Sequence, residues 1–316
     1  MQLWEEAEKI SILGFEIYRF GFFIALGLAA AVAVISFLSW AKRCRRGTAP
    51  LLAVLGILLG GVFSRVGFCL MNQEMGSLMP VSSWFRITGG GWSMIGAVGG
   101  VMFAAWLTAK LTGEKGAVMR DIAACALPAF LALERAGEDS IPDFDYSRLL
   151  ESTFLNGTFL TRSDYDGYYL ATNRLAVIVM ALLMIILLLS MIRSKREGDT
   201  CLLFLLLFGA CSVMLESLRY DRFLSISFVG LQHILAAVIL LIGVIAAARP
   251  NFAAHGKLAS AAVISVFAAA AIAVGLEFAL DRTTVNKLLI YAVYVVVIFT
   301  PAVMGIRLIH LAPERK

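Results

Sequence analysis

The chain has 316 residues, of which 60% are hydrophobic and only 16% are charged, and its net charge is +5. A water-soluble protein of this size needs more charged residues to cover its surface. The composition therefore excludes an ordinary soluble protein. The five cysteines lie within or beside apolar stretches without CxxC spacing or histidine neighbours. We therefore expect free thiols, no disulfide framework, no metal site and no cofactor.

Nine apolar stretches approach or reach the ~20 residues that a helix needs to cross a hydrocarbon layer of ~30 Å. In chain order they are residues 17–40, 49–72, 91–111, 118–134, 173–192, 200–218, 226–248, 258–280 and 287–309. The sequence therefore predicts an all-α, polytopic transmembrane helix bundle. Residues 1–248 carry the unusual polar features, and residues 249–316 are expected to add two plain transmembrane helices.

The charges between the spans predict the orientation. Acidic residues precede the first span, whereas the connections after the first, third, fifth and seventh spans and the C-terminal tail are rich in lysine and arginine. Because basic connections stay in the cytoplasm, we expect the N-terminus outside, the C-terminus inside, and a bacterial plasma membrane as the location. The positive charge then faces anionic lipid headgroups and indicates no nucleic-acid partner.

Several ionisable residues lie at the expected outer ends of the spans, where a charge is costly unless something meets it. They are Arg65 in the second span, Glu134, Arg135 and Glu138 at the end of the fourth, and Glu216 and Arg219 at the end of the sixth. A bundle that gathers them would suit a phospholipid headgroup, because arginine donates in a fork to phosphate oxygens. The structural alternative is an ion-pair network that locks the helices together.

The glycines allow two interpretations. Gly56-xxx-Gly60 and Gly96-xxx-Gly100 are spaced for close helix packing in membranes. The run of three glycines from Gly89, directly before a span, is typical of backbone amides that receive an anion. The long outer connections, 73–90 and 135–172, are expected to be functional or mobile.

A series of short polar and glycine-rich segments runs through residues 12–248. In chain order the segments are Leu13-Gly14-Phe15-Glu16-Ile17-Tyr18-Arg19-Phe20-Gly21, Gly60-Gly61, Arg65-Val66-Gly67-Phe68, Asn72, Phe85-Arg86, Gly89-Gly90-Gly91-Trp92-Ser93-Met94-Ile95-Gly96, residues 121–128, Arg135-Ala136-Gly137, Glu216-Ser217-Leu218-Arg219 and Gly230-Leu231-Gln232. This ordered series resembles the prolipoprotein diacylglyceryl transferase family, whose members move diacylglycerol from phosphatidylglycerol to the cysteine thiol of a lipoprotein signal peptide.

The resemblance implies a seven-helix core, with residues 249–316 as an extension. It also implies that Arg65, Arg135 and Arg219 hold the anionic headgroup and that Glu216 orders them. The same chamber would be lined by Asn72, Gly89, Gly90, Ser93 and Gln232. The expected partners are phosphatidylglycerol and a lipoprotein signal peptide.

The chain departs from the family pattern at four positions. Ile95 stands where the family has a histidine thought to help activate the thiol, and Ser212, Phe20 and Glu138 replace an arginine, a tyrosine and an asparagine. A thiol of pKa ~8.5 is mostly protonated at neutral pH, so some base should assist its attack. Glu138 and His233 are candidate bases, the alternative for His233 being a core histidine bonded to a backbone carbonyl.

Three functions are therefore weighed. The first is a transferase-like membrane enzyme that delivers diacylglyceryl to a thiol or another nucleophile. The second is a catalytically inactive paralogue that binds lipid or a partner protein, with the last two helices as the partner surface. The third, a small-solute transporter, is disfavoured because paired repeats and midplane charges are missing from the sequence.

Overall fold

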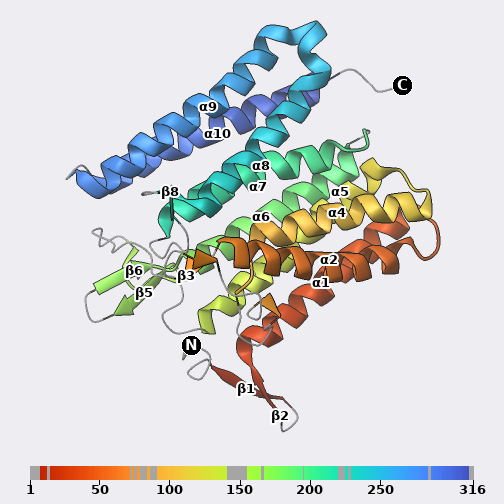
Figure 1. The fold of residues 1–316 in the computed structure, drawn as a ribbon, viewed down its shortest axis with the longest axis horizontal. Helices are drawn as coiled ribbons and strands as arrows, with labels where there is room; N and C mark the ends of the chain where they lie inside the picture. Colours follow the sequence, from red (N-terminus) through yellow and green to blue (C-terminus); the bar gives the residue numbers. More distant parts are fainter. Residues whose placement is uncertain are drawn as a thin grey trace. The chain divides into compact units, whose positions relative to one another are not determined.

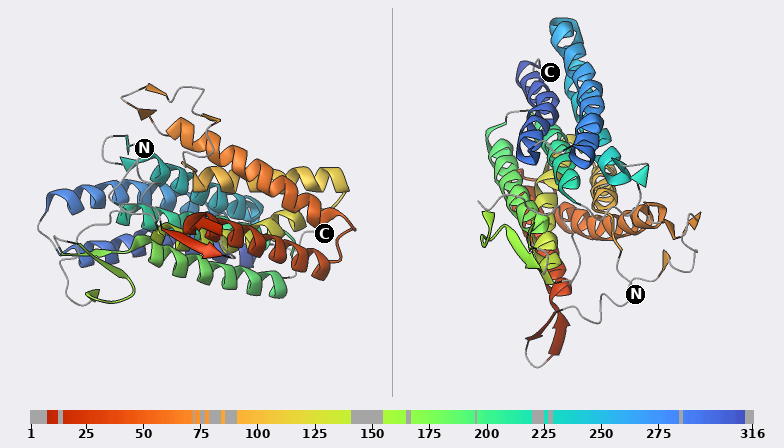
Figure 2. Two further views of the ribbon diagram at one scale, coloured as in Figure 1. Left: turned by 90° about the horizontal axis from the view of Figure 1, so that it is seen from below. Right: turned by 90° about the vertical axis from the view of Figure 1, so that its left-hand side faces the viewer.

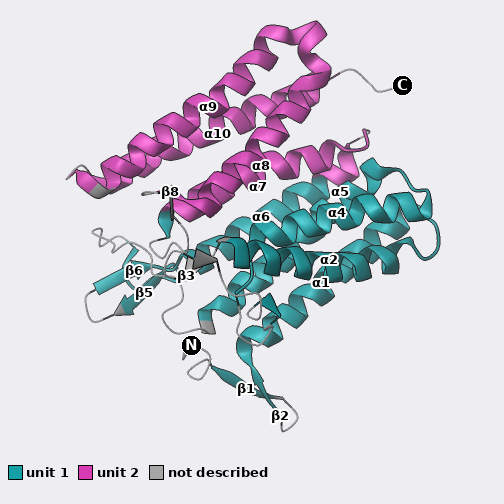
Figure 3. Ribbon diagram, in the orientation of Figure 1, with its two compact units in different colours: residues 1–189, 218–221 teal, residues 190–217, 222–316 magenta. Residues whose placement is uncertain are grey.

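The computed structural model describes residues 8–12, 15–71, 73–74, 77–78, 84–85, 91–140, 155–164, 167–194, 196–219, 225–226, 229–283 and 286–312. The predicted site residues Asn72, Gly89 and Gly90 lie outside this part of the chain. The chain divides into two compact units (Figure 3). Unit 1 comprises Met1–Leu189 and Leu218–Asp221, and unit 2 comprises Ser190–Ser217 and Arg222–Lys316.

Unit 1 is built on four helices that form a ring. They are α1 (Arg19–Ala41), α2 (Thr48–Met71), α4 (Met94–Thr112) and α5 (Gly116–Gly137). Helix α1 packs against α2 and α5, and α4 packs against α2 and α5 (Figure 1). Most of α6 (Thr172–Arg193) also belongs to this unit. Because every helix is long and apolar, the ring can bury its backbone polar groups within the helices themselves.

Short antiparallel strand pairs and a 3-10 turn lie at the helix ends of unit 1. The strand pairs are β1 (Lys9–Ile12) with β2 (Phe15–Tyr18), β3 (Gln73–Glu74) with β4 (Ser77–Leu78), and β5 (Thr161–Asp164) with β6 (Gly167–Leu170). The turn η2 (Glu138–Ser140) directly follows α5. The β1–β2 hairpin projects beyond the start of α1 (Figure 2).

Glycine allows α2 and α4 to approach with their backbones in contact. A Cβ added at Gly96 would meet the backbone of Ser64 at 2.9 Å, and one at Gly100 would meet the Cα of Gly60 at 2.9 Å. The predicted close approach through Gly96 and Gly100 is therefore confirmed. Gly56 is different, since a Cβ there has no atom within 4 Å.

Unit 2 contains the helices α7 (Asp199–Leu218, all but its last residue), α8 (Leu231–Ala248), α9 (Phe252–Arg282) and α10 (Lys287–Leu311), with the short pair β7 (Ser225–Ile226) and β8 (Val229–Gly230). The turn η4 (Arg249–Asn251) joins α8 to α9, and the buried Asn251 side chain donates 2.9 Å bonds to the carbonyls of Ala247 and Leu308. Arg196 donates to the carbonyls of Ile309 and Ala312 at the end of α10. The two C-terminal helices thus pack with α8 in one unit.

The helices confirm the prediction of a polytopic transmembrane bundle. Among the described residues, eight candidate spans are long and apolar enough to cross a membrane. One of them, Leu231–Leu280, contains α8 and all but the last two residues of α9, which the sequence predicted as separate spans at 226–248 and 258–280. Helix α9 begins earlier than predicted, at Phe252, and has a non-helical residue at His255 (φ −132°, ψ 41°). The five cysteines, all among the described residues, are thiols that form no disulfide bond.

Candidate functional site

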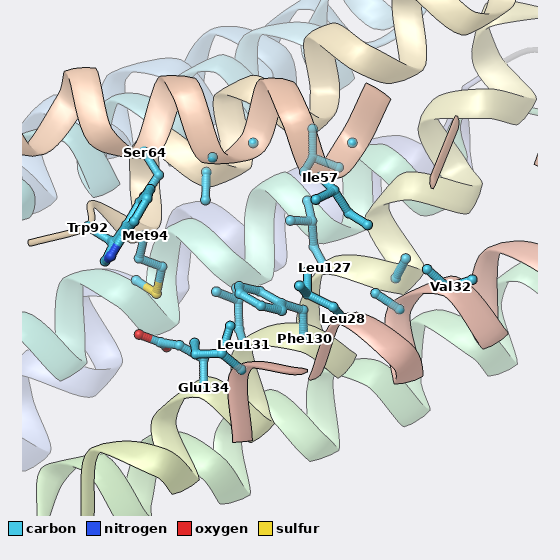
Figure 4. Close-up of a pocket in the computed structure, with 18 of the residues that line it drawn as sticks. Leu28, Val32, Ile57, Ser64, Trp92, Met94, Leu127, Phe130, Leu131 and Glu134 are labelled. Atoms are coloured by element: carbon cyan, nitrogen blue, oxygen red, sulfur yellow. The ribbon is translucent and has the colours of Figure 1, made fainter. Parts of the chain in front are cut away.

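A partly open cavity of about 390 Å³ lies among the helices α1, α2, α4 and α5 (Figure 4). Ser64, Trp92, Met94 and Glu134 lie together at one end, which we call the polar end. From there the cavity runs between aliphatic and aromatic side chains, including Leu28, Val32, Ile57, Leu127, Phe130 and Leu131. A space with these walls accommodates hydrocarbon, because nothing along most of its length can satisfy a polar guest.

Small residues on α2 create this space. Gly56, Gly60 and Gly61 all line the cavity, and a Cβ at Gly56 or Gly61 would have no atom within 4 Å. The spacing predicted Gly56 as a helix-packing position, whereas it faces the cavity. The physical reason is that only the Gly96 and Gly100 side of the α2–α4 contact brings two backbones together.

A buried cluster of charges stands at the polar end. Arg135 Nη1 donates to Glu138 Oε1 at 2.5 Å, and Arg135 Nε lies 3.4 Å from Glu134 Oε2. The side chains of Arg135 and Glu138 are only 9% and 4% exposed. Arg135 Nη2 also donates to the sulfur of Met94 at 3.4 Å. Because Met94 and Glu134 line the cavity, Arg135 is held at its edge.

The other two predicted arginines approach the same end. Arg219, 8% exposed, acts electrostatically on Glu134, so Arg135 and Arg219 share one carboxylate. Arg65, 9% exposed, donates to the carbonyl of Gly91 at 2.8 Å and lies 6.0 Å from the centroid of the Trp92 ring. Because Glu134 and Trp92 line the polar end, all three arginines lie near that end of the cavity, although none of them lines it. Arg219 follows the last residue of α7, so helical spacing from Glu216 does not set its direction.

Ser93 has a structural part at this end. Its Oγ accepts from the amide of Gly96 at 3.2 Å and so caps α4, while its carbonyl accepts from Ser64 Oγ at 2.9 Å. Gly91 has a φ of +80°, and a Cβ there would overlap the ring of Phe68. Only glycine meets both demands, since a positive φ disfavours other residues.

The remaining predicted residues belong to unit 2. His233 is buried, and its Nε2 shares a 2.8 Å hydrogen bond with the buried hydroxyl of Tyr294 on α10. This arrangement resembles the core-histidine alternative, with a tyrosine hydroxyl in place of the backbone carbonyl. Glu216 on α7 and Gln232 on α8 are both partly buried. Among the described residues, no group of three or more His, Cys, Asp or Glu is placed to hold a metal ion.

A second polar cluster, not predicted from the sequence, fastens the chain next to Glu138. The Asp139 carboxylate accepts from Arg162 at 2.5 Å, from Arg174 at 2.9 and 3.0 Å, and from Asn173 at 3.2 Å. Burial raises the pKa of Asp139, but these hydrogen bonds outweigh it and hold the pKa well below its usual range. The ionised Asp139 thereby ties β5 and the start of α6 to η2.

Comparison with known proteins identifies the family. The family model of prolipoprotein diacylglyceryl transferase matches residues 8–249. The chain belongs to this family. In a comparison with curated proteins, none matches the chain. Members of the prolipoprotein diacylglyceryl transferase family are transferases of lipoprotein biosynthesis that act on lipid and prolipoprotein substrates, and the family explains the multi-pass fold.

The extent of the match places the unusual residues inside the family region. The match includes the charge cluster and His233 but ends before α9 and α10. That residues 249–316 form a separate extension stays a prediction, because the compact units divide the chain elsewhere. Ile95, which the sequence comparison predicted at a histidine position of the family, is not among the residues that line the cavity, although its neighbour Met94 is.

Proposed function

We propose that the protein transfers diacylglyceryl from phosphatidylglycerol to the cysteine thiol of a lipoprotein signal peptide. The observation that carries this proposal is an apolar cavity with a buried arginine cluster at one end only. An acyl chain would occupy the apolar length, and the phosphodiester would lie at the polar end. Phosphatidylglycerol fits both halves, since it is an anionic lipid.

The charges at the polar end support an anionic guest. Arg65, Arg135 and Arg219 stand with two carboxylates, Glu134 and Glu138. Each guanidinium offers several donors in a planar fork that fits phosphate oxygens, so a phosphodiester would bind beside the contacts that already join Arg135 to Glu134 and Glu138.

The reaction would proceed by displacement. The thiol sulfur attacks the glycerol carbon that carries the phosphate, the carbon–oxygen bond breaks, and its electron pair leaves on glycerol phosphate. The arginines would stabilise the charge that develops on the leaving oxygen. Glu138 would hold Arg135 in place. On the family pattern alone, we keep as proposed substrate contacts the residues Glu216, Asn72, Gly89, Gly90, Ser93 and Gln232. His233 stays a candidate base on the same ground.

The orientation predicted from the loop charges would place this chemistry outside the cytoplasm. With the N-terminus outside a bacterial plasma membrane, the polar end lies in the outer leaflet. The basic connection that contains Arg45, whose amide donates to Glu114 at 2.7 Å, lies in the cytoplasm. A secreted signal peptide and the lipid headgroup would then meet on the same side.

A transfer assay tests the proposal. Purified protein is incubated in nanodiscs with labelled phosphatidylglycerol and a lipoprotein signal peptide, and peptide mass and released glycerol phosphate are measured. We expect one diacylglyceryl group per cysteine and an equal amount of glycerol phosphate. Arg135→Gln should abolish both, whereas Arg120→Gln, at an exposed position of the same helix, should abolish neither. Absence of transfer by the wild-type protein with every peptide offered would contradict the proposal.

The inactive paralogue remains the second candidate because Ile95 replaces the family's histidine. Such a protein would bind phosphatidylglycerol at the same place and release no glycerol phosphate. Saturable lipid binding that Arg135→Gln removes, together with a blank transfer assay, would favour it.

A further inference from the structure

The cavity presents one ionisable side chain to its interior. Of the lining residues, all in the described part of the chain, only Glu134 has an acidic or basic side chain. It lies at the polar end, and in Figure 4 its carboxylate is directed toward Met94 and Trp92. Any proton that leaves a nucleophile inside this cavity therefore has one side-chain acceptor along its walls.

Of the two carboxylates beside Arg135, Glu134 is held less tightly by hydrogen bonds. Glu138 Oε1 receives the 2.5 Å hydrogen bond from Arg135, is 4% exposed, and does not line the cavity. Glu134 Oε2 lies 3.4 Å from Arg135 Nε and accepts no hydrogen bond from the described residues. Glu138 Oε2 likewise has no donor among the described residues, but Glu138 does not line the cavity. A buried carboxylate oxygen without a donor is costly, and only that of Glu134 can face a ligand in the cavity.

The other positions considered for a base are less suitable. Ile95, at the position where the family has a histidine, cannot accept a proton and does not line the cavity. His233, in unit 2, shares its Nε2 with the hydroxyl of Tyr294. The charged groups that act on Glu134 are Arg135, Glu138 and Arg219, and α1, α2 and α4 contribute no ionisable side chain to the cavity wall.

We propose that Glu134 is the base that activates the acceptor thiol, in the place of the family's missing histidine. The inference rests on the proposed diacylglyceryl transfer. The Glu134 carboxylate takes the thiol proton as the sulfur forms its bond to the glycerol carbon. The carbon–oxygen bond breaks, and its electron pair leaves on glycerol phosphate. The proton then passes from Glu134 to the departing phosphate, which restores the carboxylate for the next cycle.

Glu134→Gln tests the inference, because it keeps the shape of the side chain and removes the base. Lipid binding, measured by cross-linking to a photoactivatable phosphatidylglycerol, should be unchanged, so the KM for lipid is expected to hold. General-base catalysis contributes on the order of 10²–10⁴-fold, so kcat should fall by that factor. Glu114→Gln, at the opposite helix ends, is the matched carboxylate control and should leave kcat unchanged.

A selenocysteine acceptor separates a base from a merely structural residue. A selenol ionises at lower pH than a thiol and needs no base, so a selenocysteine peptide should restore most of the lost rate in Glu134→Gln. It should not restore Glu138→Gln, in which Arg135 loses its support. If the wild-type protein transfers nothing, both the proposed function and this inference fail. If the wild type is active and Glu134→Gln is equally active, or is slow with the selenol as well, this inference alone is overturned.

Discussion

The buried pair of Arg135 and Glu138 gives the sharpest stability prediction. Their side chains are 9% and 4% exposed and are joined at 2.5 Å. Removing one partner of a buried ion pair costs about 3–5 kcal/mol, since the other charge is left without compensation. The cost of Arg135→Met should reach the upper part of this range, because Glu134 also loses the neighbouring positive charge. Glu138→Gln should cost less, because Glu134 still lies beside Arg135.

Thermal unfolding of the protein in detergent, followed by tryptophan fluorescence, measures these costs. With ~2–4 °C per kcal/mol for a unit of this size, Arg135→Met should lower Tm by roughly 10–20 °C. The double variant should be more stable than the two single costs predict when they are added, by about 0.5–3 kcal/mol. Arg120→Met, exposed on the same helix, should change stability by less than about 0.5 kcal/mol. A shift below 2 °C for Arg135→Met, or additive single variants, would refute the buried contact.

Three further predictions concern other parts of the fold. Gly100→Ala should lower the free energy of unfolding by about 1–3 kcal/mol, because the new Cβ meets the α2 backbone. Gly56→Ala should raise it by up to ~1 kcal/mol, because the Cβ enters open space. A Tm that is higher for Gly100→Ala than for Gly56→Ala would contradict this packing of α2 and α4. The lowered pKa of Asp139 means that its contribution to stability is full above the unfolded pKa of ~3.9 and is lost only as pH falls through the lower folded value. Proteolysis of residues 155–170 should therefore stay slow in the wild type from pH 7 down to about pH 4. Asp139→Asn should speed this proteolysis over the whole range, and equal cleavage rates in the variant and the wild type would contradict the role of Asp139. Tyr294→Phe should cost about 1–3 kcal/mol in thermal unfolding, because His233 loses a buried hydrogen bond; an unchanged Tm would count against that bond.

The helices and their order could be predicted from the sequence because each span is a continuous apolar run. The helix ends are shifted by a few residues, and α9 extends beyond its apolar stretch. The Gly96 and Gly100 contact was also predictable, since small residues four apart have few other uses in a membrane helix. The same spacing at Gly56 was misleading, because sequence does not say which face of α2 meets a helix and which meets a cavity.

The site was only partly predictable. Arg65 and Arg135 stand out because a charge at the end of an apolar span demands a partner. The direction of Glu134 could not be predicted, since Arg135 next to it can pair with a carboxylate on either side. The sequence around His233 does not indicate Tyr294 as its partner, because Tyr294 lies 61 residues away in an apolar stretch of α10. Asp139 and Arg174 meet across a long connection with no periodicity to align them.

The most direct test of the account is to map where phosphatidylglycerol sits, using a photoactivatable group on its acyl chain. We expect cross-links on residues inside the ring, such as Leu28, Leu127 and Phe130, and their loss in Gly61→Leu, which fills the cavity without striking the backbone. Labels confined to outward-facing residues such as Trp40 and Leu58, unchanged in Gly61→Leu, would contradict the claim that the cavity holds the lipid substrate.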